Sequence, residues 1–215
     1  MLVDKRIDNF KQLNWLDEFL IGHKGFIAGG CFKNIFNRDK VRDLDIFFES
    51  MADWEDATYY FDRHTPGYMF DDKESEEYTF YYENKNVKAY KHIKTGIVLE
   101  LCCKIFGTPE QILDQFDFTI VKFAYYKKKV KDEDGNESIQ DSILCDDCFF
   151  EHLFLKRLCI DNNINFPAST FERMFKYARY GYFPCKETKL KIINALKDLP
   201  DSEVDLSASL YDGVD

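Results

Sequence analysis

The chain has 215 residues, of which 45% are hydrophobic and 17% aromatic, so it is long and apolar enough to bury a sizeable core and too apolar for a disordered segment. Its net charge of −10 argues against a generally basic nucleic-acid binder. No apolar run reaches membrane-spanning length, and the start MLVDKRIDNF lacks the apolar core of a signal peptide. Seven cysteines, an odd number, favour free thiols over a disulfide framework. These features predict a soluble, cytoplasmic protein.

The charge is unevenly distributed along the chain. Residues 49–83 hold eleven acidic residues against two basic ones, whereas residues 152–197 hold nine basic residues against three acidic ones. A molecule with this polarity can offer one face to RNA or to a nucleotide although its net charge is negative. The alternative is that both segments form solvated faces that bind nothing.

The first part of the chain alternates helix and strand. Residues 8–21 place five apolar side chains at helical spacing, and Gly22 follows as a stop signal, which predicts a packing helix. The pattern then predicts two strands with a helix between them and an acidic helix after them, at 26–30, 31–37, 43–48 and 51–64.

The second of these strands carries two carboxylates. Asp43 and Asp45 are two residues apart, so they project from the same face, while Leu44 and Ile46 point into the core. Two ionised carboxylates about 4 Å apart repel each other by about 4 kcal/mol at an effective dielectric of about 20. Such a pair on a hydrophobic strand requires a compensating cation, and an all-oxygen site suits Mg²⁺ or Mn²⁺.

A glycine pair precedes the aspartates. Gly29 and Gly30 end the first strand, and because they lack a Cβ, their amides and that of Cys31 can approach a phosphate closely. The N-terminus of the helix that follows favours an anion at the same place. Carboxylates that bind a metal, next to a phosphate site, predict phosphoryl or nucleotidyl transfer.

The stretch FIAGGCFKNIFNRDKVRDLDIFF resembles the DNA polymerase β-like nucleotidyltransferases, and within them the class II tRNA CCA-adding enzymes and bacterial poly(A) polymerases. Those proteins share Gly-Gly, an Arg-Asp pair and then Asp-x-Asp. Gly30 lies thirteen residues before Asp43, which is the usual spacing of that family. Lys33 and Asn34 stand where the family has Arg-Asp. The resemblance implies an α+β fold, with a mixed or antiparallel sheet flanked by helices.

Three further strands are expected after an acidic loop at 71–77, at 78–83, 86–93 and 97–104. Glu100 lies in the middle of the last strand, where a buried carboxylate requires a metal or a cationic partner. The alternative is an edge glutamate that faces water. The resemblance implies a third metal-binding carboxylate on such a strand. In the family this strand ends in a basic residue, and Lys104 resembles that residue.

A short helix is expected to begin at Thr108 and Pro109 and to end near Gln115. Farther along, residues 127–138 predict a polar hairpin with Asp134 in its turn. The run KKKVK at the start of this hairpin is interpreted as a solvated tip, with contact to a phosphate backbone as the alternative.

The segment FDFTIVKFAYY between that helix and the hairpin resembles the second motif of the family, Arg-Arg-Asp-Phe-Thr-Ile-Asn-Ala. Asp117 and Thr119 match it, and the resemblance implies that they orient the sugar or brace the site. Glutamine and phenylalanine replace the arginine pair, and Val121 replaces the asparagine. Because the missing groups engage the nucleotide in the family, triphosphate binding here is expected to be weaker or to use Lys122 or other basic residues.

Helices are expected over the C-terminal part of the chain, at about 147–161, 168–181 and 186–199. Arg173, Lys176 and Arg179 recur every three residues and resemble the Arg-x-x-Arg-Ala-x-Arg-Phe helix of class II enzymes. With Lys33 they are candidates to bind triphosphate oxygens. The alternative is a structural basic face that pairs with the acidic first half of the chain.

One helical side is predicted to bring together four residues with metal-binding side chains, Cys145, Cys148, His152 and Cys159. Zinc is one interpretation, but a single CxxC without a second such pair favours buried thiols.

The motifs and the change from a strand pattern to a helical pattern predict three parts of the chain. These are a catalytic head at 1–145, a helical neck-like subdomain at 146–200 and an acidic tail at 201–215.

The predicted activity is metal-dependent transfer of an NMP from an NTP, ATP or CTP, to a hydroxyl group. Asp43, Asp45 and Glu100 are the predicted catalytic and metal-binding residues. The predicted nucleotide-binding residues are Gly29, Gly30, Cys31, Lys33, Asp117, Arg173, Lys176 and Arg179.

The acceptor is left open by the residues. The resemblance points to an RNA 3′ end, such as that of a tRNA-like molecule. A protein or small-molecule hydroxyl is the alternative, as in toxin–antitoxin-like nucleotidyltransferases. A non-catalytic binding or structural protein is a further alternative, which the missing arginines and asparagine favour and the three retained acids oppose.

Overall fold

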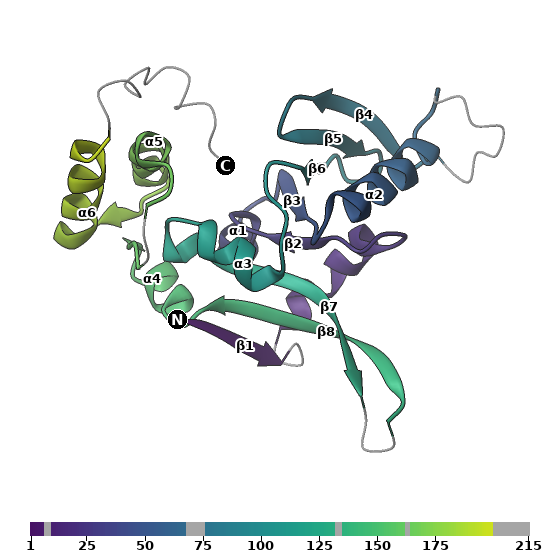
Figure 1. Ribbon diagram of the computed structural model, residues 1–215, viewed down its shortest axis with the longest axis horizontal. Helices are drawn as coiled ribbons and strands as arrows, with labels where there is room; N and C mark the ends of the chain where they lie inside the picture. Colours follow the sequence, from purple (N-terminus) through teal and green to yellow (C-terminus); the bar gives the residue numbers. More distant parts are fainter. Residues whose placement is uncertain (7–9, 68–75, 132–134, 162–163, 200–215) are drawn as a thin grey trace.

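The protein is described from a computed structural model, which places residues 1–6, 10–67, 76–131, 135–161 and 164–199. One large sheet with helices on both faces makes up most of the molecule, and α5 and α6 lie beside it (Figure 1). The predicted α+β fold class is therefore confirmed. Most of the predicted acidic loop, Asp134 of the predicted turn and the predicted tail at 201–215 lie outside the described residues.

The sheet has eight strands in the order β1-β8-β7-β2-β3-β6-β5-β4. In chain order they are β1 Leu2–Arg6, β2 Phe26–Ala28, β3 Asp43–Phe47, β4 Tyr78–Glu83, β5 Val87–His92, β6 Val98–Cys102, β7 Phe123–Lys131 and β8 Glu137–Asp146. The pairs are antiparallel except β3 and β6, which run parallel in the middle of the sheet. The strands predicted to hold carboxylates are thus neighbours.

The described helices are α1 Cys31–Asn37, α2 Met51–Arg63, α3 Pro109–Gln115, α4 Phe149–Phe154, α5 Pro167–Arg179 and α6 Lys186–Lys197, with 3-10 helices η2 Lys11–Leu20 and η3 Thr119–Val121. Two short strands, β9 Arg157–Leu158 and β10 Phe183–Pro184, pair in parallel. No helix in the described part of the chain is long and apolar enough to cross a membrane.

Most predicted elements are confirmed, including α3, which begins with a capping box between Thr108 and Gln111. The long helix predicted at 147–161 is wrong in its second half. Lys156 adopts a left-handed conformation with φ 54°, which ends the helical path after α4 and directs the chain into β9. The predicted helix at 8–21 is the 3-10 helix η2, and strand β1 was not predicted.

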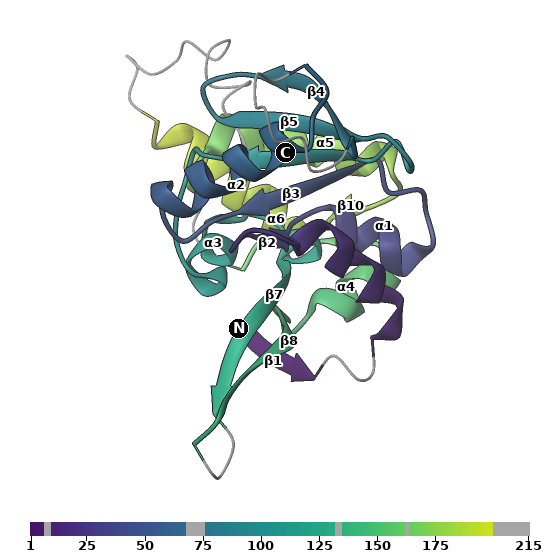
Figure 2. The same cartoon turned by 90° about the vertical axis from the view of Figure 1, so that its right-hand side faces the viewer.

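The two faces of the sheet carry separate parts of the core. One face, with Ile46 and Leu99, packs against η2, α1 and α2, whereas the other, with Phe47 and Cys102, packs against α3 (Figure 2). Because side chains alternate along a strand, Asp45 lies on the face of Phe47, towards α3. The polar site therefore belongs to the α3 face of the sheet.

His23, after η2, forms two backbone hydrogen bonds that require the neutral imidazole. Its Nε2 lies 3.0 Å from the carbonyl of Phe19, and its Nδ1 accepts from the amide of Gly25 at 3.0 Å. Burial lowers the pKa of His23 from 6.5 to about 4, against the smaller raising effect of the Phe19 carbonyl. Protonation would convert the Nδ1 acceptor into a donor and break the bond from Gly25.

This pKa predicts that the free energy of unfolding depends on pH. Because the unfolded state takes up the proton first, the contribution of His23 is complete above pH 6.5 and is lost as the pH falls towards 4. We expect a loss of about 2 kcal/mol in the free energy of unfolding between pH 7 and pH 5 that His23→Gln does not show. Urea denaturation of both proteins at the two pH values measures it, and an equal loss in both would contradict it.

Candidate functional site

The carboxylates come together on the parallel pair of strands. In the register of β3 and β6, Asp45 lies opposite Glu100 and Asp43 opposite Val98. Asp45 is only 8% exposed, Asp43 is exposed at the start of its strand, and Glu100 is half-buried. Leu44 is fully buried on the other face, as predicted. Three acidic side chains thus project from one face of two adjacent strands.

Glu100 is held by a tyrosine from the neighbouring hairpin. The hydroxyl of Tyr82 donates to Glu100 Oε1 at 2.7 Å. Burial raises the pKa of Tyr82, and the bond to Glu100 raises it further, so the hydroxyl keeps its proton. Because β6 lies between β3 and β5, the alternative of an edge-strand glutamate is wrong.

The carboxylate oxygens of the three acids are not gathered around one point. Among the described residues, the trio whose ligand atoms lie within 4.8 Å of one another is Asp146, Asp147 and Cys148, on the other side of the sheet's centre. The donor set of Asp43 and Asp45 still fits a hard divalent cation, because both are carboxylates and they share a strand face. Glu100 uses Oε1 to accept from Tyr82, which leaves the assignment of its other carboxylate oxygen to the proposed site.

The glycine pair lies directly beside Asp45. Gly29 has φ +104°, and a Cβ on it would lie 3.2 Å from Asp45 Oδ2 and 3.6 Å from the ring of Phe116. The amide of Gly29 donates to the carbonyl of Phe123 at 3.0 Å. This corrects one part of the predicted phosphate site, because the Gly29 amide is already used in the sheet. Gly30 caps α1, and Cys31 begins it.

Gly29→Ala is expected to lower the free energy of unfolding by about 1–2 kcal/mol, because L side chains rarely adopt its backbone conformation and the new methyl would press on Asp45. Gly30→Ala is the matched control. Gly30 has φ −68°, and a Cβ on it would meet the Tyr177 hydroxyl at an ordinary 3.8 Å. Urea denaturation compares the two variants, and equal stabilities would contradict the expectation.

A cleft of about 520 Å³ opens beside the aspartates. It is lined by six of the predicted site residues, Gly30, Cys31, Lys33, Asp43, Asp45 and Lys176. Burial, and then the charges of Asp45 and Asp43, raise the pKa of the Cys31 thiol, which therefore stays protonated. Acids from β3 and bases from α1 and α5 thus face one polar space.

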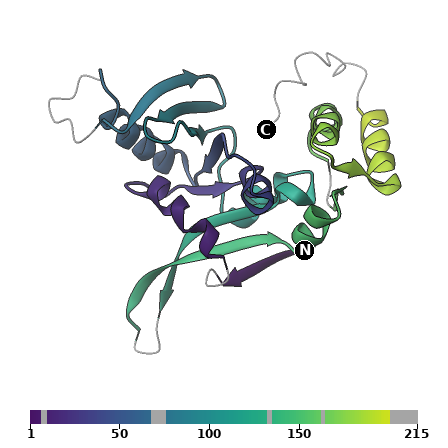
Figure 3. The same cartoon turned by 180° about the vertical axis from the view of Figure 1, so that it is seen from behind.

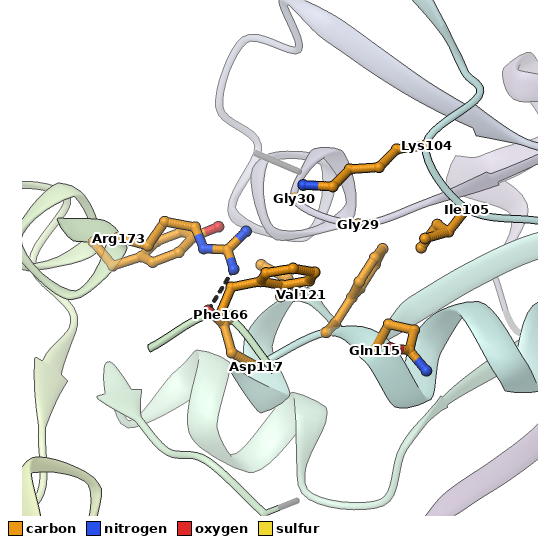
Figure 4. Close-up of a pocket in the computed structure, with 11 residues that line it drawn as sticks. Gly29, Gly30, Lys104, Ile105, Gln115, Asp117, Val121, Phe166 and Arg173 are labelled. Carbon is orange, nitrogen blue, oxygen red and sulfur yellow. Dashed lines mark ion pairs between the residues drawn. The ribbon is translucent and has the colours of Figure 1, made fainter. Parts of the chain in front are cut away.

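Arg173 and Asp117 form a buried ion pair instead of facing this cleft. Arg173 Nη2 lies 2.8 Å from Asp117 Oδ2 (Figure 4), and their side chains are 13% and 5% exposed. Asp117 also accepts from the Thr170 hydroxyl at 2.9 Å and from the Phe118 amide at 2.8 Å. The pair joins α5 to the segment after α3, which agrees with the bracing role implied for Asp117.

The ion pair lies at a second, smaller pocket of about 30 Å³, which Gly29 and Gly30 also line (Figure 4). The rings of Phe116, Phe166 and Tyr177 make its wall mostly apolar. The pocket and the larger cleft share Gly30 and Tyr177, so they meet at the glycine pair.

Besides Arg173, two more of the predicted basic residues do not line the cleft. Arg179 is exposed near the end of α5. Lys122 is fully buried, with its Nζ 2.7 Å from Asp161 Oδ1, so the suggestion that it replaces the missing arginines is wrong. The cleft instead contains Lys156, Tyr180 and Tyr182. Lys156 was missed because it lies in a segment predicted to be helical, where nothing marks its side chain.

The predicted cysteine cluster is only partly formed. Cys145 is fully buried in β8, whereas Cys148, His152 and Cys159 line a pocket of about 280 Å³ together with Cys185. Burial raises the pKa values of Cys145 and Cys159 to about 11 each. The Thr119 hydroxyl lies 2.8 Å from His152 Nδ1, so this matched residue lines the cysteine-containing pocket of about 280 Å³ and does not line the cleft beside the aspartates.

The architecture is the nucleotidyltransferase fold of CCA-adding enzymes. A CCA-adding enzyme in complex with CTP superposes with a TM-score of 0.59, at 17% identity over 92% of this chain and 46% of that one. The Thermotoga maritima CCA-adding enzyme complexed with tRNA gives a TM-score of 0.57, at 15% identity over 92% of this chain and 47% of that one. At these identities the likeness concerns the fold alone.

The model of the Gabija anti-defense 2 (Gad2) family matches residues 6–156, and the chain belongs to this family. Gabija anti-defense 2 of Bacillus phage SPbetaL7 is 24% identical over 185 residues, which cover 86% of this chain and 40% of the phage protein. The chain therefore spans well under half the length of that curated relative.

Proposed function

We propose that this chain carries the catalytic head of a metal-dependent nucleotidyltransferase, which moves an NMP from an NTP to a hydroxyl acceptor. The observation that carries the proposal is the placement of Asp43 and Asp45 on one strand face, beside the glycine pair and opposite basic residues across one cleft. Repelling acids on an otherwise apolar strand are costly to keep without a cation. The head at 1–145 and the helical subdomain at 146–200 are proposed to close this cleft from its two sides.

Each group in the cleft has a proposed task. Asp43 and Asp45 would hold Mg²⁺ or Mn²⁺, which would polarise phosphate oxygens and lower the pKa of the attacking hydroxyl. Glu100 would accept the proton of that hydroxyl. The amides of Gly30 and Cys31 would donate to phosphate oxygens, and Lys33 and Lys176 would neutralise charge on the leaving pyrophosphate. Asp117 and Arg173 would hold α5 in place and border the nucleotide.

The acceptor is proposed to be a component of the Gabija defence system, because the chain belongs to a family described by its action against that system. Modification by an NMP would then inactivate the component. An RNA 3′ end is the second candidate, favoured by the shared fold with enzymes that add CCA to tRNA. A relationship to the class II CCA-adding enzymes that goes beyond the shared fold is proposed only together with this second candidate.

The test is incubation with each α-³²P-labelled NTP and Mg²⁺ or Mn²⁺, in one arm with total RNA and in another with purified Gabija components. Asp43→Asn/Asp45→Asn is the control. Label on a Gabija component that the control lacks is expected. Label on RNA alone would support nucleotidyl transfer and would identify RNA, instead of a Gabija component, as the acceptor. An absence of label in both arms, with no metal-dependent NTP binding by calorimetry, would overturn catalysis in favour of a non-catalytic binding protein.

A further inference from the structure

Lys156 is an unusual residue in the wall of the cleft. It has φ 54°, a conformation that costs an L residue about 1–2 kcal/mol and that glycine adopts freely. No motif that resembles the nucleotidyltransferases includes it. Nevertheless its side chain lines the same cleft as Asp43 and Asp45. A strained residue that is not glycine, placed at a polar cleft, suggests that its side chain is needed there.

The ammonium group of Lys156 is held in position by neutral partners. Its Nζ donates to Asn37 Oδ1 at 3.1 Å and to the Tyr182 hydroxyl at 3.0 Å, and it lies 4.5 Å from the centre of the Tyr182 ring. Asn37 also donates to the Tyr182 hydroxyl at 2.7 Å, and Tyr182 is only 1% exposed. These contacts fix the direction of Lys156 without neutralising its charge.

Three other lysines and one arginine share the cleft with Lys156, and of these Lys40 and Arg42 are exposed. Lys33, from α1, is 7% exposed and lies 5.1 Å from the centre of the Tyr180 ring, and Lys176 comes from α5. Burial lowers the pKa of Lys33, and the charges of Lys156 and Lys176 lower it further, although Asp39 acts in the opposite direction. Lys33, Lys156 and Lys176, from three segments, therefore repel one another around one space, and a multiply charged anion would relieve this repulsion.

We propose that Lys156 acts with Lys33 and Lys176 as a clamp for the triphosphate chain of the nucleotide, and that it supplies the charge lost with the family's arginine pair. The inference rests on the proposed function and names a positioning residue for it. A triphosphate fits better than a single phosphate because several cations line the cleft, with Lys33, Lys156 and Lys176 among them, and Asp43 and Asp45 are placed to hold its cation. Gln115 and Phe116 replace the arginine pair that the family uses. Lys122 is buried and pairs with Asp161.

Lys156→Gly separates a binding role from a structural one, because glycine suits φ 54° and removes the amine. With inorganic tripolyphosphate and with ATP, each in Mg²⁺, calorimetry of the full chain is expected to give about tenfold weaker binding, while the melting temperature stays equal or rises. Lys156→Arg should retain most of the affinity. Arg38→Gly is the matched control, since Arg38 has φ 61°, caps α1 and does not line the cleft.

Equal tripolyphosphate affinity in the wild type and Lys156→Gly would overturn the inference, as would no binding by the wild type. A loss confined to a single-stranded RNA oligonucleotide would overturn it too and assign Lys156 to an RNA backbone. The clamp and the proposed function are refuted by different results. Nucleotidyl transfer with an unchanged KM for ATP in Lys156→Gly would refute the clamp alone, whereas Lys156-dependent binding without transfer would refute catalysis and leave the clamp.

Discussion

Asp45→Asn is expected to reduce nucleotidyl transfer by about 10³-fold or more and to leave the protein at least as stable as the wild type in the absence of metal. The rate loss follows because a bound cation contributes several kcal/mol to the transition state and Asp45 is the buried member of its carboxylate pair. The stability is retained because the amide removes a repulsion of about 1 kcal/mol or more with Asp43.

The same variant changes how stability responds to metal. Millimolar Mg²⁺ is expected to raise the melting temperature of the wild type and not that of Asp45→Asn, because a ligand that binds only the native state stabilises it. Asp114→Asn, which alters an exposed acid on α3, should behave as the wild type does in both assays. Transfer activity in Asp43→Asn/Asp45→Asn would show that the aspartate pair is not the metal site.

Asp117→Ala is expected to lower the free energy of unfolding by about 3 kcal/mol, measured by urea denaturation. The substitution leaves the charge of Arg173, 13% exposed, without the Asp117 carboxylate and removes the acceptor of Thr170 and of the Phe118 amide. Because this pair joins α5 to the segment after α3, affinity for the nucleotide should fall with it.

Two comparisons test the cause of that loss. Asp117→Ala/Arg173→Met removes both charges and should recover part of the stability, because no uncompensated charge remains buried. Asp4→Ala breaks a surface pair with Lys128, whose side chains are 51% and 48% exposed, and should cost less than about 1 kcal/mol. If Asp117→Ala costs no more than Asp4→Ala, the ion pair does not hold α5.

The central part of the fold could be predicted because its local signals agree with its tertiary environment. The alternation of polar and apolar residues around β3, together with Gly29 and Asp45, predicts both the strand and its polar face. Strand β1, LVDKR, was missed because its register partner is β8, more than a hundred residues away, and its own composition is mixed. The helix predicted across Lys156 failed because periodicity does not reveal a left-handed residue.

The site was predictable to the same extent. Motif spacing identifies Asp43, Asp45 and Gly30, which the cleft does bring together. Spacing cannot decide between a cation that faces a ligand and one that is paired inside the protein. Arg173 and Lys176 lie on one predicted helix face, yet Arg173 pairs with Asp117 while Lys176 reaches the cleft. Lys122 was misassigned for the same reason.

The parallel pairing of β3 and β6 has a consequence for the order of folding. The chain forms α2, β4 and β5 between these two strands, so their pairing closes a long loop, whereas the β4–β5, β5–β6 and β7–β8 pairs join neighbours in sequence. Loop closure of this kind is entropically costly and comes after local pairing. Asp45 and Glu100 therefore approach each other only after the local hairpins have formed. The repulsion at the site then affects a later step of folding and leaves the earlier hairpins unaffected.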